Sequence, residues 1–126
     1  MINLTREQIE NEPAGRTMDA WIAEYVMEWR HTSIGWITKD NIANIKTCYW
    51  KPSDDIAAFW MVIDKLDRKE WDIQIVSDTE EEGKEWGVSF YRYSEADALE
   101  HGSATADTVP LAGCRARLLA MLEREA

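Results

Sequence analysis

The side chains best suited to chemistry in this chain are aromatic rings and two arginines, and the chemistry they favour is binding. Several of the rings lie outside the apolar stripes of the predicted helices and strands, where they could form a floor for a planar ligand. An arginine guanidinium can hold an anionic group and also stack on such rings. The candidate binding residues are Arg16, Trp36, Trp50, Tyr91, Arg92 and Tyr93. The same aromatic side chains could instead pack a protein–protein interface or cover a sheet edge.

The sequence contains no catalytic signature. Dinucleotide-binding glycine motifs, P-loops, serine-hydrolase elbows and HExxH sites do not occur in it. The cysteines and histidines stand alone, without the short ligand spacing of metal sites (Cys48, Cys114, His31, His101). The acids at 54–55 suit a helix N-terminus, and those at 80–82 suit a solvated turn. We therefore predict no catalytic residue, no metal and no cofactor, with Cys114 a small core side chain.

Charge is distributed unevenly along the chain. It has 24 acidic and 14 basic residues, and the stretch from 70 to 107 alone holds eleven acids and two bases. Nucleic acids and membrane surfaces attract clustered lysine and arginine, so neither is expected as a partner. The acidic stretch could act as a mimic of DNA, but its acids gather at a turn and a loop instead of following a surface at phosphate spacing.

Periodicity predicts four helices in a single domain spanning 1–126. A capping box at residues 5–8 begins the first helix, and Thr17 caps a second helix that runs to residue 29. Ser53 caps a third helix, and Pro110 opens a fourth, with Arg115 and Arg117 on its outer side. Five tryptophans are assigned to the core, and Trp60 is expected to pack against a sheet (Trp21, Trp29, Trp60, Trp71, Trp86).

Two pairs of alternating runs predict β-hairpins between these helices. The runs 71–77 and 86–93 form one pair, and 34–38 with 45–50 form the other. Residues 94–108 have no periodicity and are predicted to be a loop. The expected fold class is α+β, in the order α-α-(β-β)-α-β-β-α.

Three segments of this sequence resemble the phage ABA sandwich domain family, which consists of small phage and prophage proteins. They are PAGRTMDAWIAEYVMEW at 13–29, PSDDIAAFW at 52–60 and PLAGCRA at 110–116. The resemblance spans most of the chain and is weakest at 30–51. It implies a three-layer sandwich in which an antiparallel sheet lies between helical layers. It implies no catalytic residues.

Two kinds of binding function follow for a protein with no expected catalytic group. The first is a non-enzymatic phage accessory protein that binds a host or phage protein, or a second copy of itself as a homo-oligomer. The alternative is a ligand-sequestering protein that holds a nucleotide-derived host-defence signal in an aromatic and arginine pocket. The longest uncharged apolar stretch, 56–63, is too short to span a bilayer. The N-terminal residues do not resemble a signal peptide, so the expected location is the cytoplasm.

Overall fold

The computed structural model describes all residues except 1, 42, 68, 79–84, 93–99 and 126, and the side chains of 78, 100, 124 and 125 are also left undescribed. The described chain is α+β. Its helices are α1 (Arg6–Asn11), α2 (Arg16–Trp21), the π-helical turn η1 (Ile22–Val26), the 3-10 turn η2 (Thr47–Tyr49), α3 (Ile56–Asp64) and α4 (Val109–Glu125). Its strands are β1 (Arg30–Thr32), β2 (Gly35–Ile37), β3 (Asn44–Ile45), β4 (Trp71–Asp78), β5 (Glu85–Arg92) and β6 (Glu100–Ala106).

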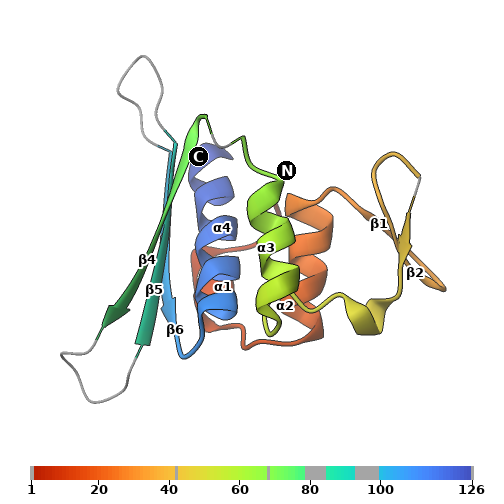
Figure 1. The fold of residues 1–126 in the computed structure, drawn as a ribbon, viewed down its shortest axis with the longest axis horizontal. Helices are drawn as coiled ribbons and strands as arrows, with labels where there is room; N and C mark the ends of the chain where they lie inside the picture. Colours follow the sequence, from red (N-terminus) through yellow and green to blue (C-terminus); the bar gives the residue numbers. More distant parts are fainter. Residues whose placement is uncertain (1, 42, 68, 79–84, 93–99, 126) are drawn as a thin grey trace.

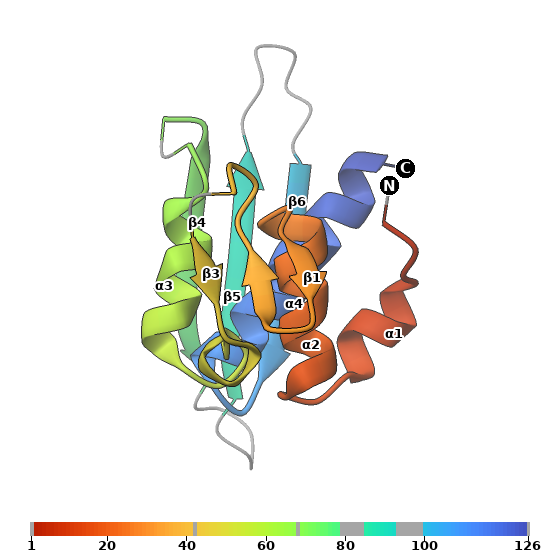
Figure 2. The same ribbon diagram turned by 90° about the vertical axis from the view of Figure 1, so that its right-hand side faces the viewer.

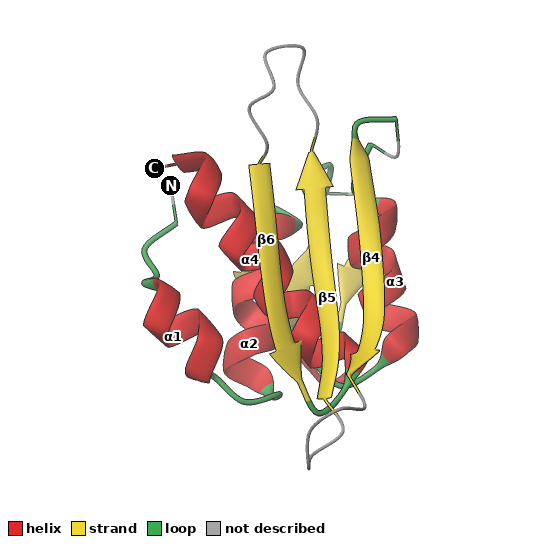
Figure 3. Ribbon diagram, turned by 90° about the vertical axis from the view of Figure 1, so that its left-hand side faces the viewer, coloured by secondary structure: helices red, strands yellow, loops and turns green. Residues whose placement is uncertain are grey.

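The elements form layers whose order differs from the expected sandwich. The antiparallel sheet β4-β5-β6 lies on one side, the helices lie in the middle, and the small antiparallel sheet β1-β2-β3 lies beyond them (Figure 1). Figure 3 looks onto the face of the large sheet that carries no helix. In the described residues the helices thus cover one face of the large sheet, and the expected helix–sheet–helix order is not seen.

The hairpin predicted between 71 and 93 is confirmed for its described residues. Ile73 pairs with Phe90 and Ile75 with Val88, so the apolar residues of β4 and β5 share one face as expected. Val88 and Phe90 are fully buried under the helices. The opposite face carries Gln74, Ser89 and other polar side chains.

The prediction of a loop at 94–108 is wrong for residues 100–106, where β6 pairs with β5 along its whole length. Residues 94–99 lie outside the described part of the chain. The inward residues of β6 are Gly102, Ala104 and Ala106, which are too small to produce a hydrophobic alternation. Their size serves the packing of α4. A Cβ at Gly102 would overlap the carbonyl oxygen of Ala116 and the backbone nitrogen of Ala120, so the strand lies directly against the helix.

The second helix differs from its prediction at both ends. Its N-cap is Gly15, not Thr17, and the α-helical hydrogen bonding gives way to a π-helical turn at Ile22. The predicted apolar face survives this change, since Met18, Ile22, Val26 and Trp29 are all buried. The capping box of α1 is confirmed, with Thr5 and Gln8 each accepting from the other's backbone N–H.

Helix α3 begins at an N-cap formed by Asp55, whose side chain accepts from the Ala57 N–H, so the expected cap at Ser53 is wrong. The predicted burial of Trp60 is also wrong, because 52% of that residue is exposed. Phe59 is buried instead, with its ring against Gly113 of α4. Periodicity could not choose between the two rings, because residues 56–63 are apolar on every side of the helix.

The burial of the other tryptophans is partly the reverse of the expectation. Trp36 and Trp50, which lie outside every predicted stripe, are 3% and 2% exposed, whereas Trp86 is 38% exposed. Trp36 lies in β2 and Trp50 follows η2, which are too short to show a periodic signal. The predicted hairpin of 34–38 and 45–50 is confirmed only in part: β2 pairs with the short β3, but residues 47–49 form η2 instead of a strand. β1 adds a strand that the sequence did not indicate.

The prediction that Arg115 and Arg117 lie on the outer side of α4 is wrong. Arg117 is buried, with its guanidinium carbon 5.2 Å from the centre of the Trp71 ring. Arg115 donates hydrogen bonds to the carbonyl oxygens of Thr105 and Glu12, both at 3.0 Å. Long apolar stems let arginines lie against a core while their charged ends find partners.

Replacing Gly102 with alanine should lower the free energy of unfolding by about 3 kcal/mol, because the new methyl group has to displace the backbone of α4. Gly87→Ala is the matched control in the neighbouring strand, where the nearest atom to an added Cβ is the Val76 carbonyl oxygen at 3.9 Å. Urea denaturation of both variants measures the difference. Equal stabilities would contradict the close approach of β6 and α4.

Candidate binding site

A cleft between α2 and the small sheet brings together half of the predicted binding residues. Figure 2 shows this sheet in front of α2. The cleft consists of two adjoining hollows of about 280 and 410 Å³, both lined by Arg16, Asp19, Thr47 and Trp50. The first also touches Ala20, Glu24, His31 and Trp36, and the second touches Ala14, Gly15, Cys48, Lys51 and Asp54. Together they reach the size of a small-ligand pocket. We call them the Arg16 cleft.

The inner wall of the Arg16 cleft is held by a buried carboxylate. Asp19 Oδ1 accepts hydrogen bonds from the Ser53 backbone N–H at 2.9 Å and from its hydroxyl at 2.6 Å. The Ser53 hydroxyl oxygen in turn accepts from the Gly15 N–H at 3.0 Å. This network joins the start of α2 to the segment that precedes α3. Burial raises the pKa of Asp19, and the hydrogen bonds from Ser53 only partly offset that effect.

Tryptophan side chains build the remainder of the wall. The indole N–H of Trp50 donates to the Asp19 carbonyl oxygen at 3.0 Å, which fixes the orientation of the ring. Its ring centre lies 4.4 Å from that of Trp29, in a tilted contact. On the other side, the rings of His31 and Trp36 are 4.7 Å apart. Trp36 and Trp50 therefore face the cleft as the fixed surfaces of packed rings.

Arg16 is an exposed cation of this cleft. Its side chain is exposed, and within the described part of the chain it forms no hydrogen bond or ion pair. Lys51 adds a second cation, whereas Glu24 and Asp54 place acids on the rim. The cleft thus offers an unpaired guanidinium beside aromatic walls, in surroundings of mixed charge.

The other predicted binding residues do not belong to this cleft. Tyr91 lies on the open face of the large sheet, where its ring stacks on His101 at 4.8 Å and its hydroxyl donates to Gln74. Arg92 points to the opposite face of β5 and forms an ion pair with Glu70 at 3.0 Å. The prediction of a common aromatic floor requires the six residues to lie at one site, and the structure separates them. Tyr93 lies outside the described residues.

Sequence reasoning missed Asp19, Ser53 and His31 as residues of the cleft. Asp19 was interpretable as a first-turn acid and Ser53 as a helix cap, which are the commonest uses of such residues near helix starts. A buried carboxylate is visible only once the contact over 34 positions of sequence is known. His31 carried no motif, and its role follows from its position beside Trp36 in the hairpin.

Three further observations bear on the predictions from the sequence. Among the residues that the structure describes, no group of three or more His, Cys, Asp or Glu side chains could hold a metal ion. The acids at 80–82, which the DNA-mimic interpretation needs, lie outside the described residues. No described helix is long and apolar enough to cross a membrane.

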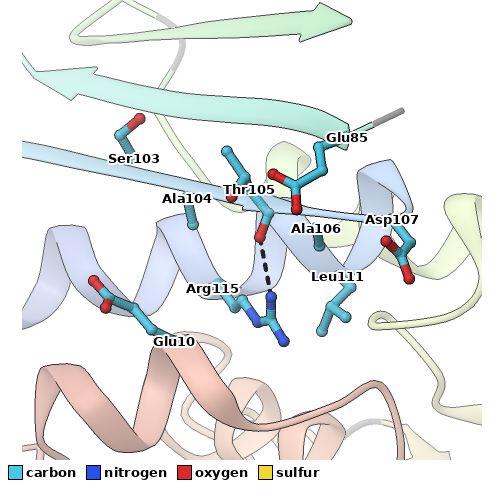
Figure 4. Close-up of a pocket in the computed structure, with 9 residues that line it drawn as sticks. All are labelled: Glu10, Glu85, Ser103, Ala104, Thr105, Ala106, Asp107, Leu111 and Arg115. Atoms are coloured by element: carbon cyan, nitrogen blue, oxygen red, sulfur yellow. Dashed lines mark hydrogen bonds between the residues drawn. The ribbon is translucent and has the colours of Figure 1, made fainter. Parts of the chain in front are cut away.

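A third hollow, of about 490 Å³, runs along β6 on the other side of the molecule (Figure 4). Residues 103–106 of the strand line it, together with Glu10, Leu111 and Arg115. Its centre is occupied by the hydrogen bond from Arg115 to the Thr105 carbonyl oxygen. It holds no ring and none of the predicted binding residues.

Substitution of Asp19 tests the network that holds the cleft. Asp19→Ala removes the acceptor for two buried donors and should lower the free energy of unfolding at pH 7 by about 2–3 kcal/mol. Asp19→Asn keeps an acceptor oxygen and loses the buried charge. Because burial raises the Asp19 pKa in the folded state, the fold binds this proton more tightly than the unfolded chain does. The resulting contribution to stability is present at low pH and is lost as the pH rises through the folded-state pKa.

The Asn variant should therefore gain in stability relative to the wild type as the pH rises from about 3, below the ordinary Asp pKa of about 4, to neutrality. Urea denaturation across this range measures both effects. A stability difference that does not change with pH would mean that Asp19 ionises as freely in the folded chain as in the unfolded chain.

The similarity of this chain to known proteins lies at the level of a family model. No curated protein and no solved structure matches the chain significantly. The family model for the phage ABA sandwich domain matches residues 20–118. This range runs from the last turn of α2 through both sheets and most of α4, and it includes the aromatic wall of the cleft. The chain belongs to the phage ABA sandwich domain family.

Proposed function

We propose that the protein is a non-enzymatic phage accessory protein that works in the host cytoplasm by binding a small ligand in the Arg16 cleft. One observation carries this proposal. The fold brings Arg16, Trp36 and Trp50 from three separate segments to one hollow, where the guanidinium has no partner among the described residues. A cation beside fixed aromatic walls suits a planar ring that bears a negative charge.

The charges around the cleft narrow the class of ligand. Arg16 and Lys51 are opposed by Glu24, Asp54 and the buried Asp19. Because acids outnumber bases around the cleft, the several negative charges of a polyphosphate would not all be neutralised. A ligand with one or two negative charges can be neutralised by Arg16 and Lys51 alone. A cyclic or otherwise esterified nucleotide meets this requirement and also supplies donors for the rim acids. Sequestration of such a nucleotide-derived defence signal requires tight binding and no chemical step.

The side chains of the cleft favour binding over catalysis. Ser53 and Asp19 are the nearest approach to a nucleophile and base, with their oxygens 2.6 Å apart. Ser53 is fully buried, however, so a substrate cannot reach its hydroxyl. Both groups are used to hold the wall in place.

A protein partner is the other function that the sequence favours, through an interface built partly on Trp36 and Trp50. Both rings are almost fully buried within the chain, so they cannot form the centre of such an interface. The same burial limits a ligand to the small part of each ring that lines the hollow, which is less surface than a protein interface needs.

Binding in the cleft should depend on Arg16. We expect Arg16→Gln to weaken the affinity for a bound cyclic mononucleotide or cyclic dinucleotide by about tenfold or more, the usual effect of removing a charge-assisted hydrogen bond. Arg6→Gln is the control, because this exposed arginine of α1 pairs with Glu10 at 3.2 Å away from the cleft. Isothermal titration calorimetry with cyclic AMP, cyclic di-GMP and ADP-ribose measures the affinities.

Native mass spectrometry of the purified protein shows in parallel whether a ligand is retained. The proposal fails if none of the three compounds binds and no ligand is retained. It also fails if Arg16→Gln binds as tightly as the Arg6→Gln control.

A further inference from the structure

We propose that two copies of the chain associate through the free edge of β4, which pairs with β4 of the second copy to make one continuous six-stranded sheet. The inference concerns a surface separate from the Arg16 cleft, and it does not depend on ligand binding. It rests on the difference between the two edges of the large sheet and on the composition of α3.

The edge at β6 is partly occupied by a side chain. Arg115 donates from one guanidinium nitrogen to the Thr105 carbonyl oxygen (Figure 4). From the other it donates to the Glu12 carbonyl oxygen at the end of α1. This arginine therefore occupies one of the backbone groups to which a further strand would bond. Side chains that cover an edge in this way prevent unwanted pairing.

The edge at β4 has no such protection among the described residues. Beyond its ladder with β5, the strand's further backbone hydrogen bond in this part of the chain runs from the Trp71 N–H to the Asp67 carbonyl oxygen. The eight residues of β4 include no proline and no lysine, and its charged residues, Asp72 and Asp78, lie near its two ends. Ile75 and Val76 in its centre are 43% and 49% exposed. A long edge with exposed β-branched residues is a template for another strand.

Helix α3 supplies apolar surface on the same side of the molecule. It lies behind β4 at the same edge of the fold in Figure 3, and both elements lie toward the viewer in Figure 1. Besides its buried residues, it leaves Ile56 and Trp60 each 52% exposed and Met61 44% exposed. A helix that is apolar on all sides is normally buried on all sides. Helix α3 and the open strand edge therefore lie on the same side of the fold, where one partner can reach both.

A second copy fits this surface because β4 is itself the strand that its edge requires. Antiparallel pairing about a two-fold axis makes the contact self-complementary and brings the two α3 helices to the same joint. Pairing centred on Gln74 places Ile73 opposite Ile75 and Asp72 opposite Val76, with Trp71 opposite Ser77. Pairing centred on Ile75 would instead oppose Asp72 to Asp78 within the strands, and like charges directly opposite are unfavourable. The register centred on Gln74 opposes Asp78 to Glu70, which lies outside β4 and is paired with Arg92. We therefore assign the register centred on Gln74.

The test is cross-linking at the two-fold axis. In a Cys48→Ser background, which removes the exposed native thiol, Gln74→Cys places two cysteines at a separation that suits a disulfide. Ser103→Cys is the matched control on β6. Both side chains are exposed on the open face. Each substitution removes one side-chain hydrogen bond with β5, between Gln74 and Tyr91 in the first case and between Ser103 and Ser89 in the second.

After oxidation with copper phenanthroline, we expect about tenfold more covalent dimer for Gln74→Cys than for Ser103→Cys, because only the first pair lies within disulfide distance. Sedimentation velocity of the unmodified chain should show a dimer, and Trp60→Gln should weaken its association by about tenfold or more through loss of the apolar contact at α3. Arg16→Gln should still form a dimer.

Equal cross-linking at the two positions, or none at Gln74, would overturn the proposed edge. A strict monomer at micromolar to millimolar concentration would overturn the association itself. Neither result would affect the ligand proposal, which the calorimetry of the Arg16 variant decides separately.

Discussion

The close contact between α4 and β6 determines where the other elements of the fold can lie. Because the strand presents Gly102, Ala104 and Ala106 inward, the backbone of the helix approaches the sheet at the distance of direct contact. The helix then fills the space above β5, where Val88 and Phe90 are buried. Its far side receives Phe59 of α3 against Gly113. A larger residue at either glycine would push helix, strand and ring apart together.

The elements that could be predicted from the sequence are those with strong periodic or capping signals. The capping box of α1, the apolar face of α2, the β4–β5 hairpin and the opening of α4 near Pro110 all have such signals. The strand β6 could not be predicted because its inward residues are glycine and alanine, whose low hydrophobicity gives no recognisable alternation along the strand. For α3 the opposite problem arose, since a helix that is apolar on all sides does not reveal which of Phe59 and Trp60 is buried.

The candidate site could be predicted only in part, for a reason that lies in tertiary structure. Arg16, Trp36 and Trp50 were identifiable by residue type, and the fold does collect them. The alternation of β5 separates Tyr91 from Arg92, although the two are neighbours in the sequence. The wall of the cleft depends on a hydrogen bond between Asp19 and Ser53. Their local sequence contexts suggest instead a first-turn acid and a helix cap in two unrelated helices. Contacts between distant segments, more than residue types, decide which side chains share a site.

The arginine at the β6 edge has a consequence for the size of any assembly. A sheet with two open edges can add neighbours on both sides and grow without limit into a filament. Arg115 bonds the Thr105 carbonyl oxygen on one side, which removes an acceptor that a further strand at β6 would need. In the proposed assembly the pairing of two β4 strands uses the other edge, so the joined sheet ends in a β6 strand on each side. One side chain on α4 thus favours a pair of chains over a growing polymer.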